Sequence, residues 1–497
     1  MHRTKLAPFI FTLLMALTYG MGVGAYSLLE PDTCFLLAMG RWICQHMTLP
    51  TTDPFSYTFA MWAEPQGLVV YQWLTEVIFY AVAKASGTLG LVTFDCVILI
   101  WAFLIIPWRI MQHFQVLPLR AAVIAAYVAL GSIERMRLRP EIFSYLLLSV
   151  YIEVIIRADS KECSTTVNWK LAGTLAGIMA LWANLHSGFV IGILLILMVN
   201  IKQLGWQFFK HDKNYSVVNT WSVSLLACLI ASLITPYGIG LWKYIPHLYF
   251  HAMNHFIIEL QPISAITLGT LPHFLPFMGL ALLAVWQAVR QYQRRLNACD
   301  SLYIMFAIVG IGLGLACQRM TAFALLLVLP IIGRGLGMKN ANVYLVDLRQ
   351  RRLYTLITLS AMIGSLGIVL YTHPTIPASS RDCGQPFAAV KYIAINKPSG
   401  NLLNDPHFGD VLLWNVENPP KLFHDSRFDV YVWQIMRDYM MMAECLPGWR
   451  ELFIKYKIDW VFLAPSAKLC SCLETDNQWR IAFKDKNAEI IIRKKMH

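Results

Sequence analysis

The sequence has few charged residues for its length and lacks the short signatures of several common protein classes. Of its 497 residues, 14% are charged and 57% are hydrophobic, whereas soluble domains carry about a quarter charged residues. It contains no CxxC pair, no CxxC…HxxxH spacing and no glycine-rich nucleotide fingerprint. These absences argue against a soluble domain, a structural zinc site and a nucleotide-binding enzyme.

What the sequence has instead is a series of apolar runs between Leu6 and Tyr371. Each is long enough to cross a hydrocarbon core of about 30 Å, and about eleven spans are predicted. The first follows Arg3 and Lys5 and is predicted to be an uncleaved helix rather than a signal peptide. The predicted spans lie near residues 7–27, 88–107, 119–132, 141–157, 171–185, 187–202, 219–236, 271–289, 301–317, 321–337 and 353–371.

The net charge of +12 comes from basic clusters in the loops between these runs, so it indicates topology rather than nucleic-acid binding. With the amino end in the cytoplasm, eighteen basic residues lie inside and seven lie outside before the tail. This bias predicts a multi-pass protein of the cell's inner membrane with an extracytoplasmic tail. The assignment requires Leu68–Ala85 to be an amphipathic juxtamembrane helix along the outer interface, because counting it as a span would invert every later loop.

The residues after Tyr371 have short apolar runs and a helical stretch from Tyr431 to Met442. They predict a small α/β domain, so the chain is divided into a membrane domain, residues 1–372, and an extracytoplasmic domain, residues 373–497. If the tail lies in an oxidising compartment, its cysteines can form disulfides. The candidate cysteines are Cys383, Cys445, Cys470 and Cys472.

Unusual polar residues fall on the predicted outer side. Ionisable groups at span ends are costly, so their gathering on one face indicates a site. They include Glu30, Asp32, Asp53, Arg135, Arg137, Arg139, Asn184, His186, Glu259 and Arg319.

Several segments, taken in order, resemble bacterial multi-spanning proteins of the GT-C glycosyltransferase superfamily. They are EPDTCFLLAMGRWICQHMTLPTTDPFSYT, YQWLTEVIFYAVAKASGTLGL, RLRPEIFSYLLL, WANLHSGFVIG and TPYG, followed in the tail by GDVLLWNV, KLFHDSRFDVY and YKIDWVFLAP. The resemblance implies a GT-C-like helical membrane fold and inverting sugar transfer from a polyprenyl-phosphate donor to an unknown glycan, lipid or protein acceptor. No cofactor is certain, although some GT-C enzymes need a divalent metal.

The resemblance also implies a catalytic acid in the first outer loop, a position that Asp32 matches. Relatives tend to have an aromatic pair followed by His and a later Arg nearby, where this sequence has Cys34, Phe35, Leu36 and Ala38. This difference leaves open a catalytically inactive, lipid-binding scaffold. A lipid or glycan transporter is a further alternative, although no inverted repeat is evident.

The residue chemistry leads to the same assignment. Transfer to a hydroxyl or amine needs a base while negative charge gathers on the leaving phosphate. Asp32 is the predicted base, with Glu30 or Asp53 as its partner; the alternative is that Asp32 caps a helix beginning at Thr33. The predicted phosphate-binding groups, whose alternative role is that of topology anchors, are Arg135, Arg137 and Arg139.

Four further residues are weaker candidates. His186, near Asn184, is predicted to orient the acceptor, to help the base or to hold a metal with Asp32, unless it is a hydrogen-bonded structural residue. Arg319 either binds phosphate or extends toward lipid headgroups. Glu259 follows His247, His251 and His255, which have helical spacing and indicate either metal ligation or a solvated face.

Overall fold

The computed structural model describes residues 30–61, 67–159, 166–210, 215–265, 271–293, 298–337 and 384–494. The chain divides into two compact units that interleave along the sequence. The helical unit contains the described residues of 89–239 and 257–337, and the mixed unit contains those of 30–88, 240–256 and 384–494. The spans predicted near 7–27 and 353–371, Cys383 and the domain boundary near residue 372 lie outside the described residues.

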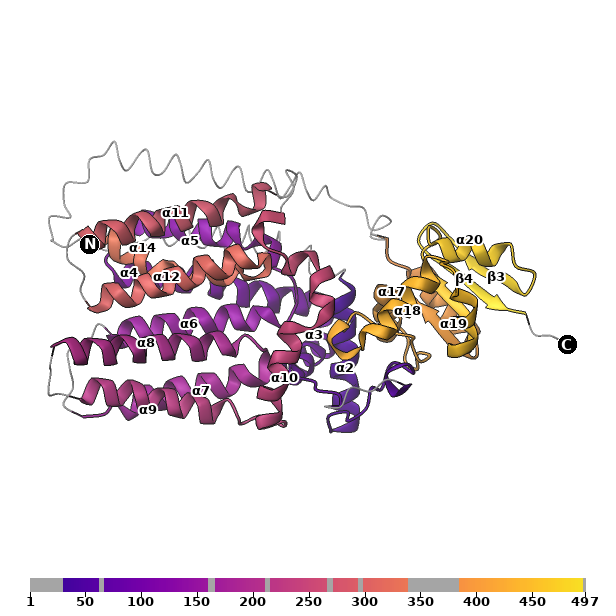
Figure 1. Ribbon diagram of the computed structural model, residues 1–497, viewed down its shortest axis with the longest axis horizontal. Coiled ribbons are helices and arrows are strands. Elements are labelled where there is room, and N and C mark those ends of the chain that lie inside the picture. The colour runs from indigo at the N-terminus through magenta and orange to yellow at the C-terminus, as the bar shows by residue number, and fades with distance from the viewer. Residues whose placement is uncertain are drawn as a thin grey trace. The chain divides into compact units, whose positions relative to one another are not determined.

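The helical unit consists of apolar helices packed side by side. In Figure 1, α6 (Glu141–Asp159), α7 (Trp169–Leu185), α8 (Phe189–Lys210) and α9 (Ser216–Ala231) run alongside one another. α7 packs against both α6 and α9, and α8 packs against α9. The other α-helices that lie wholly in this unit are α4 (Ile106–His113), α5 (Pro118–Gly131), α11 (Leu271–Gln293), α12 (Ala298–Ala316), α13 (Thr321–Leu327) and α14 (Leu329–Leu336).

Among the described residues, four helices are long and apolar enough to cross a membrane: Trp73–His113, Phe189–Phe208, Phe274–Gln293 and Gln318–Leu336. Shorter apolar helices, such as Pro118–Gly131 and Ser216–Ala231, lie where other spans are predicted. The chain is therefore mostly helical with several membrane-compatible helices, and the count of eleven stays a prediction.

The helix α3 (Trp73–Ile100) bends at Gly87, where the backbone has φ 61° and ψ −159°. Residues with a Cβ atom rarely adopt this conformation, so glycine permits the break. Beyond α3, a π-helical turn, Trp101–Ile105, leads into α4. The bend separates the predicted interfacial segment from the predicted span that follows it.

The mixed unit contains a four-stranded sheet built from the carboxyl-terminal part of the chain. Its strand order is β1-β2-β4-β3; β1 and β2 are parallel, and the other two pairs are antiparallel. The apolar segments Trp460–Leu463 and Ile490–Ile491 are buried and lie in β2 and β4, as residues of high strand propensity should. The strands are β1 (Asn401–Asn404), β2 (Ile458–Leu463), β3 (Trp479–Lys484) and β4 (Glu489–Arg493).

Along the chain, helices precede the strands and alternate with them, and together they make up the predicted α/β domain. The predicted helical stretch corresponds to α18 (Trp433–Ala443). Asp410–Trp414, one of the short apolar runs of the tail, lies in the helix α17 (Pro406–Asn415). The remaining helices of this part are α16 (Phe387–Asn396), α17 (Pro406–Asn415), α19 (Trp449–Tyr456) and α20 (Lys468–Glu474).

The mixed unit also includes residues of the first predicted outer loop, with α2 (Pro31–His46), and most of α10 (Ile239–Phe250). A short parallel bridge connects residues far apart in the sequence, because Leu422 N donates to Phe55 O at 2.9 Å and Tyr57 N donates to Leu422 O at 3.1 Å. The first outer loop and the tail therefore fold as one body.

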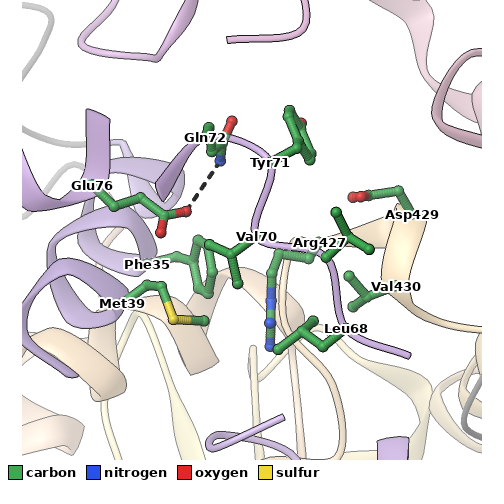
Figure 2. Close-up of a pocket in the computed structure, with 11 residues that line it drawn as sticks. Phe35, Met39, Leu68, Val70, Tyr71, Gln72, Glu76, Arg427, Asp429 and Val430 are labelled. Atoms are coloured by element: carbon green, nitrogen blue, oxygen red, sulfur yellow. Dashed lines mark hydrogen bonds between the residues drawn. The ribbon is translucent and has the colours of Figure 1, made fainter. Parts of the chain in front are cut away.

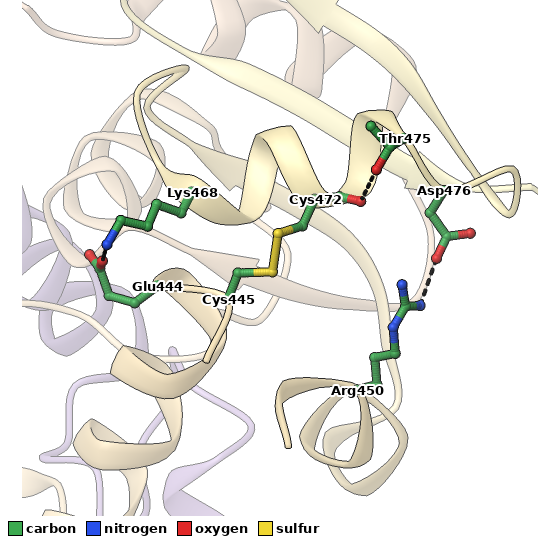
Figure 3. The surroundings of a disulfide bond; sticks show 7 residues. All are labelled: Glu444, Cys445, Arg450, Lys468, Cys472, Thr475 and Asp476. Atoms are coloured by element: carbon green, nitrogen blue, oxygen red, sulfur yellow. Dashed lines mark hydrogen bonds and ion pairs between the residues drawn. A yellow bond between two sulfur atoms is a disulfide. The ribbon is translucent and has the colours of Figure 1, made fainter. Parts of the chain in front are cut away.

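The tail also contains a disulfide between Cys445 and Cys472, shown in Figure 3. It joins the loop after α18 to α20. Cys470, the neighbouring candidate, is a buried free thiol.

Candidate functional site

Asp32, the predicted catalytic acid, lies in the first turn of α2. The helix begins at Pro31 and Glu30 occupies the N-cap position, where its carbonyl accepts a hydrogen bond from Thr33 N at 3.1 Å. Asp32 is therefore inside the helix and does not act as its N-cap.

Arg41, on the same helix, holds α17 against α2. It donates from Nη1 to Trp414 O at 3.1 Å and from Nη2 to Leu413 O at 2.5 Å, and it lies over the Trp414 ring. The last carbonyls of a helix have no partners within the helix and favour a cation. These contacts fix the carboxyl end of α17 to α2.

Near the amino ends of the same two helices, three potential metal ligands converge. A carboxylate oxygen of Asp32, a ring nitrogen of His407 and a carboxylate oxygen of Asp410 lie within 4.8 Å of one another. His407 and Asp410 are three residues apart in α17, a spacing that places them on one helix face.

Asp410 is fully buried. Its Oδ1 accepts a long hydrogen bond, 3.5 Å, from Ser426 N, and its Oδ2 has no partner among the described residues. Burial raises the pKa of Asp410 well above its ordinary value, and the nearby Asp425 and Asp32 carboxylates raise it further.

Two more buried carboxylates share one guanidinium. Arg427 Nη2 donates to both oxygens of Asp53 at 2.9 Å, and Arg427 Nε donates to Asp425 Oδ1 at 2.9 Å. Asp53 also accepts from Phe55 N and from Ser56 N, each at 3.1 Å. We call Asp32, Asp53, Asp410, Asp425 and Arg427 the acidic cluster.

Arg427 also lines a pocket of the mixed unit, shown in Figure 2. The walls are largely apolar, from Phe35 and Met39 to Val430, and the polar side chains include Gln72, Glu76 and Asp429. Glu76 Oε1 accepts from Gln72 Nε2 at 3.4 Å, while its buried Oε2 has no partner among the described residues.

In the helical unit, the three predicted arginines converge on Glu259. The distances to Glu259 carboxylate oxygens are 2.7 Å from Arg135, 3.8 Å from Arg137 and 3.5 Å from Arg139. Met136 and Leu138, which alternate with these arginines, are each 1% exposed. The alternation sends the apolar side chains into the core and leaves the guanidinium groups beside one carboxylate.

Arg319 completes this group. Its Nη2 lies 3.5 Å from Glu259 and its Nε lies 3.3 Å from Glu141. Burial works to raise the pKa of Glu259, but the guanidinium groups of Arg135, Arg139 and Arg319 outweigh it and lower the pKa to about 2. We call the four arginines with Glu141 and Glu259 the arginine cluster.

His186 is held in a neutral hydrogen-bonded network. Gly188 N donates to His186 Nδ1 at 3.1 Å, so the Ser144 hydroxyl, 2.8 Å from the same nitrogen, donates to it as well. Ser144 in turn accepts from Trp182 Nε1 at 2.7 Å. Burial lowers the pKa of His186 to about 4, although Glu141 opposes the shift.

Asn184 ties the end of α7 to the chain after α9. Its Nδ2 donates to Ala180 O at 2.8 Å and to Ile234 O at 2.7 Å. These contacts are those of a structural residue, and the predicted substrate-binding role stays a prediction.

The comparisons with known proteins concern the fold. A scan against protein-family models finds no match, and neither does a search of curated proteins. Among solved structures, the chain is similar to the archaeal oligosaccharyltransferase AglB from Archaeoglobus fulgidus in complex with an inhibitory peptide and a dolichol-phosphate. That match has a TM-score of 0.62 at 12% identity and covers 95% of this chain and 71% of the other.

Two further structures of the Archaeoglobus fulgidus oligosaccharyltransferase match with a TM-score of 0.60. One is tethered to an acceptor peptide containing the NVT sequon and is 12% identical; the other is the apo form and is 10% identical. Each covers 92% of this chain and 69% of its own. The chain therefore shares the fold of these oligosaccharyltransferase structures.

The predicted site residues fall into two sets. Glu30, Asp32 and Asp53 belong to the mixed unit. The helical unit contains Arg135, Arg137, Arg139, Asn184, His186, Glu259 and Arg319. The proposal that His186 holds a metal with Asp32 stays a prediction, and within the mixed unit His407 and Asp410 lie near Asp32.

Sequence reasoning missed His407, Asp410 and Glu76. An H-x-x-D spacing at residues 407–410 was a usable signal, because it places both side chains on one helix face. Nothing in the sequence connected it with Asp32, since α2 and α17 are separated by most of the chain. The tail residues Asp425, Arg427 and Asp429, in contrast, lie in KLFHDSRFDVY, one of the segments that carry the family resemblance.

Proposed function

We propose that the chain is a membrane glycosyltransferase that moves a sugar from a polyprenyl-phosphate donor to a hydroxyl or amine acceptor at the outer face of the membrane. The observation that carries the proposal is Asp32, the acid at the position that the resemblance assigns to catalysis, set among buried carboxylates in a GT-C fold.

In the proposed reaction, Asp32 takes the proton of the acceptor as the acceptor oxygen or nitrogen attacks the anomeric carbon. The new glycosidic bond forms on one face of the sugar while the bond to the phosphate oxygen breaks on the other, and its electron pair leaves with the lipid phosphate. The configuration at the sugar carbon inverts. Glu30 and Asp53 are the proposed partners of Asp32.

The arginine cluster is the proposed binding group for the anionic phosphate, because guanidinium groups form charge-assisted, bidentate hydrogen bonds with phosphate oxygens. The convergence of four arginines on the Glu259 carboxylate supports this role. The remaining predicted assignments are that Asn184 contacts substrate and that His186 orients the acceptor, helps the base or holds a metal with Asp32. A divalent cation, where one is bound, would be held by Asp32, His407 and Asp410 and would stabilise negative charge on the phosphate.

The Cys445–Cys472 disulfide supports the proposed outer location of the tail, since disulfides persist in oxidising compartments. Treating intact cells with a membrane-impermeant reductant followed by a thiol label tests it directly. We expect labelling of Cys445 and Cys472 without permeabilising the inner membrane; labelling that requires permeabilisation would place the tail inside.

Asp32→Asn tests the catalytic assignment because it removes the charge and keeps the shape. In proteoliposomes supplied with radiolabelled undecaprenyl-phosphate-linked hexose and a host membrane extract as acceptor, we expect transfer to fall about 10²–10⁴-fold, the usual contribution of a general base. Asp476→Asn is the matched control, since Asp476 forms an exposed surface pair with Arg450. Equal rates for Asp32→Asn and wild type would contradict the proposal, as would lipid-sugar movement without a new glycosidic bond.

A further inference from the structure

We propose that the pocket of the mixed unit shown in Figure 2 binds a primary ammonium group at the end of a short apolar chain, and that Glu76 selects this group. Such a group is carried by a lysine side chain and by the amine headgroup of a lipid. The inference concerns binding alone and requires no assumption about sugar transfer.

The carboxyl group of Glu76 is the polar group that the pocket offers to a ligand. Glu76 is 1% exposed, and its Oε2 is buried without a hydrogen-bond partner among the described residues. Its Oε1 accepts from Gln72 Nε2 at a long distance, 3.4 Å. Figure 2 shows the carboxyl group directed toward Phe35 and Val70. A buried carboxylate that lacks a partner is costly, so an N–H donor from a ligand would stabilise it.

Close helix packing holds Glu76 in place. The helix α2 lies so near α3 that a Cβ atom at Gly40 would come within 2.0 Å of Glu76 O, and glycine permits this approach. The same helix supplies Phe35 and Met39 to the pocket wall, and Asp32 lies one turn before Phe35. Positions 32, 35 and 39 share one helix face, so the pocket adjoins the proposed base.

The charged groups of the pocket wall favour a cation over an anion. Asp429 lines the pocket together with Glu76, and its Oδ2 accepts from the Tyr244 hydroxyl at 2.7 Å. Arg427 also lines it, but this guanidinium is already hydrogen-bonded at 2.9 Å to two carboxylates of the acidic cluster. An ammonium group donates charge-assisted hydrogen bonds to carboxylates, which are about twice as strong as neutral ones.

The rest of the wall determines the body of the ligand. Leu68, Val69, Val70 and Val430 are buried and apolar. Their side chains offer no hydrogen bonds to a polyhydroxylated ligand, whereas methylene groups gain free energy by burial against them. A quaternary ammonium has the charge of a primary one but no N–H to donate to Glu76. The pocket therefore suits an alkyl chain that ends in a primary ammonium group.

The test measures binding of n-butylamine to the purified full-length protein in phosphatidylcholine nanodiscs by ligand-observed NMR. No sugar donor is present, and the signal of empty nanodiscs is subtracted. We expect saturable binding to the wild type, and binding at least about tenfold weaker for n-butanol and for butyltrimethylammonium.

Glu76→Gln keeps the shape of the side chain and removes its charge. It should weaken n-butylamine binding about 10–100-fold, the contribution of a hydrogen bond to a charged group, and leave n-butanol binding nearly unchanged. Glu444→Gln is the matched control, because the Glu444 side chain is 50% exposed and pairs with Lys468 at the surface. This variant should bind n-butylamine as the wild type does.

Equal binding of n-butylamine and n-butanol would overturn the proposal, because it would show that the pocket takes up apolar chains without regard to charge. Equal binding of butyltrimethylammonium would overturn it as well, by showing unspecific attraction of cations. Both comparisons use wild-type protein, so they stay interpretable if Glu76→Gln does not fold. The absence of saturable binding, or equal n-butylamine binding by wild type and Glu76→Gln, would likewise refute the assignment.

Nanodiscs that contain phosphatidylethanolamine identify the source of the amine. Weaker n-butylamine binding in these nanodiscs would indicate competition by the lipid headgroup, and unchanged binding would indicate a soluble amine; either result retains the Glu76 site. A protein that binds n-butylamine but transfers no sugar would retain this inference and refute the proposed function. Sugar transfer by a protein that binds no amine would do the reverse.

Discussion

The acidic cluster of the mixed unit and the arginine cluster of the helical unit differ in the sign of the charged groups that predominate in them. In the first, Arg427 pairs with Asp53 and Asp425, and Asp410 retains an oxygen without a partner among the described residues. In the second, four arginines share Glu259 and Glu141. Carboxylates predominate among the named residues of one cluster and guanidinium groups among those of the other, so the first suits a cationic ligand and the second an anionic one.

The largest expected effect comes from removing the single cation of the acidic cluster. Arg427→Met leaves Asp53 and Asp425, whose side chains are both 0% exposed, without a counter-ion. Breaking a buried ion pair on one side typically costs about 3–5 kcal/mol. We expect a corresponding loss of thermal stability in nanodiscs.

The matched control is Arg450→Met, which breaks a pair whose arginine is 63% exposed (Figure 3). Such pairs contribute less than about 1 kcal/mol. Similar melting temperatures for the two variants would show that the acidic cluster does not depend on Arg427.

The converse change in the arginine cluster is Glu259→Gln. It removes the carboxylate that Arg135, Arg139 and Arg319 share, and hydrogen bonds to charged groups contribute about 1.5–3 kcal/mol. The pKa of Glu259 in the fold, about 2, is below its ordinary value of 4.5. Its ion pairs therefore stabilise the protein fully above about pH 4.5 and lose this effect as the pH falls toward 2.

Melting curves from pH 7 to pH 3 check this prediction. The difference in melting temperature between wild type and Glu259→Gln should be largest at pH 7 and should shrink below about pH 4.5. A difference that stays constant across this range would show that packing, rather than charge, accounts for the effect of the substitution.

Unlike the substitutions above, Asp410→Asn should raise the melting temperature when metal is removed by a chelator. The raised pKa of Asp410 means that its protonated form is favoured in the fold, so the wild type loses stability as the pH rises above the ordinary value of 3.8. We expect Asp410→Asn to melt about 2–4 °C above wild type at pH 8, which corresponds to about 1 kcal/mol. The gain should vanish near pH 4.

Adding Mn²⁺ sharpens the same experiment. It should stabilise the wild type by mass action and leave Asp410→Asn nearly unchanged, so the order of the two melting temperatures should reverse. A variant that is less stable than wild type at every pH without metal would show that the Asp410 carboxylate is satisfied in the native protein.

The sequence was sufficient for features that depend on local pattern. Apolar length predicted the helices, residues of high strand propensity lie in β2 and β4, and the alternation of Arg135, Arg137 and Arg139 with buried apolar residues brought the arginines together. What the sequence could not provide was long-range pairing. Asp53 is held by Arg427, and Asp32 lies beside Asp410, because the first outer loop folds onto the tail through the bridge at Leu422.

The smallest expected effect on stability is that of replacing Arg137, which we compare with its neighbour Arg135. Arg135 is 11% exposed and lies 2.7 Å from Glu259, whereas Arg137 is 29% exposed and lies 3.8 Å away. Arg137→Gln should therefore change stability by less than about 1 kcal/mol. If Arg137 contacts the donor phosphate, losing a charge-assisted hydrogen bond of about 1.5–3 kcal/mol should raise the KM for the donor about 10–100-fold.

Arg135→Gln supplies the matched contrast, because it removes the closest partner of Glu259 and should lower the melting temperature more than Arg137→Gln does. Measuring KM and melting temperature for both variants distinguishes substrate binding from structural support. If Arg137→Gln leaves the donor KM unchanged, the arginine cluster serves the fold or the lipid headgroups, and phosphate binding must be assigned elsewhere in the chain.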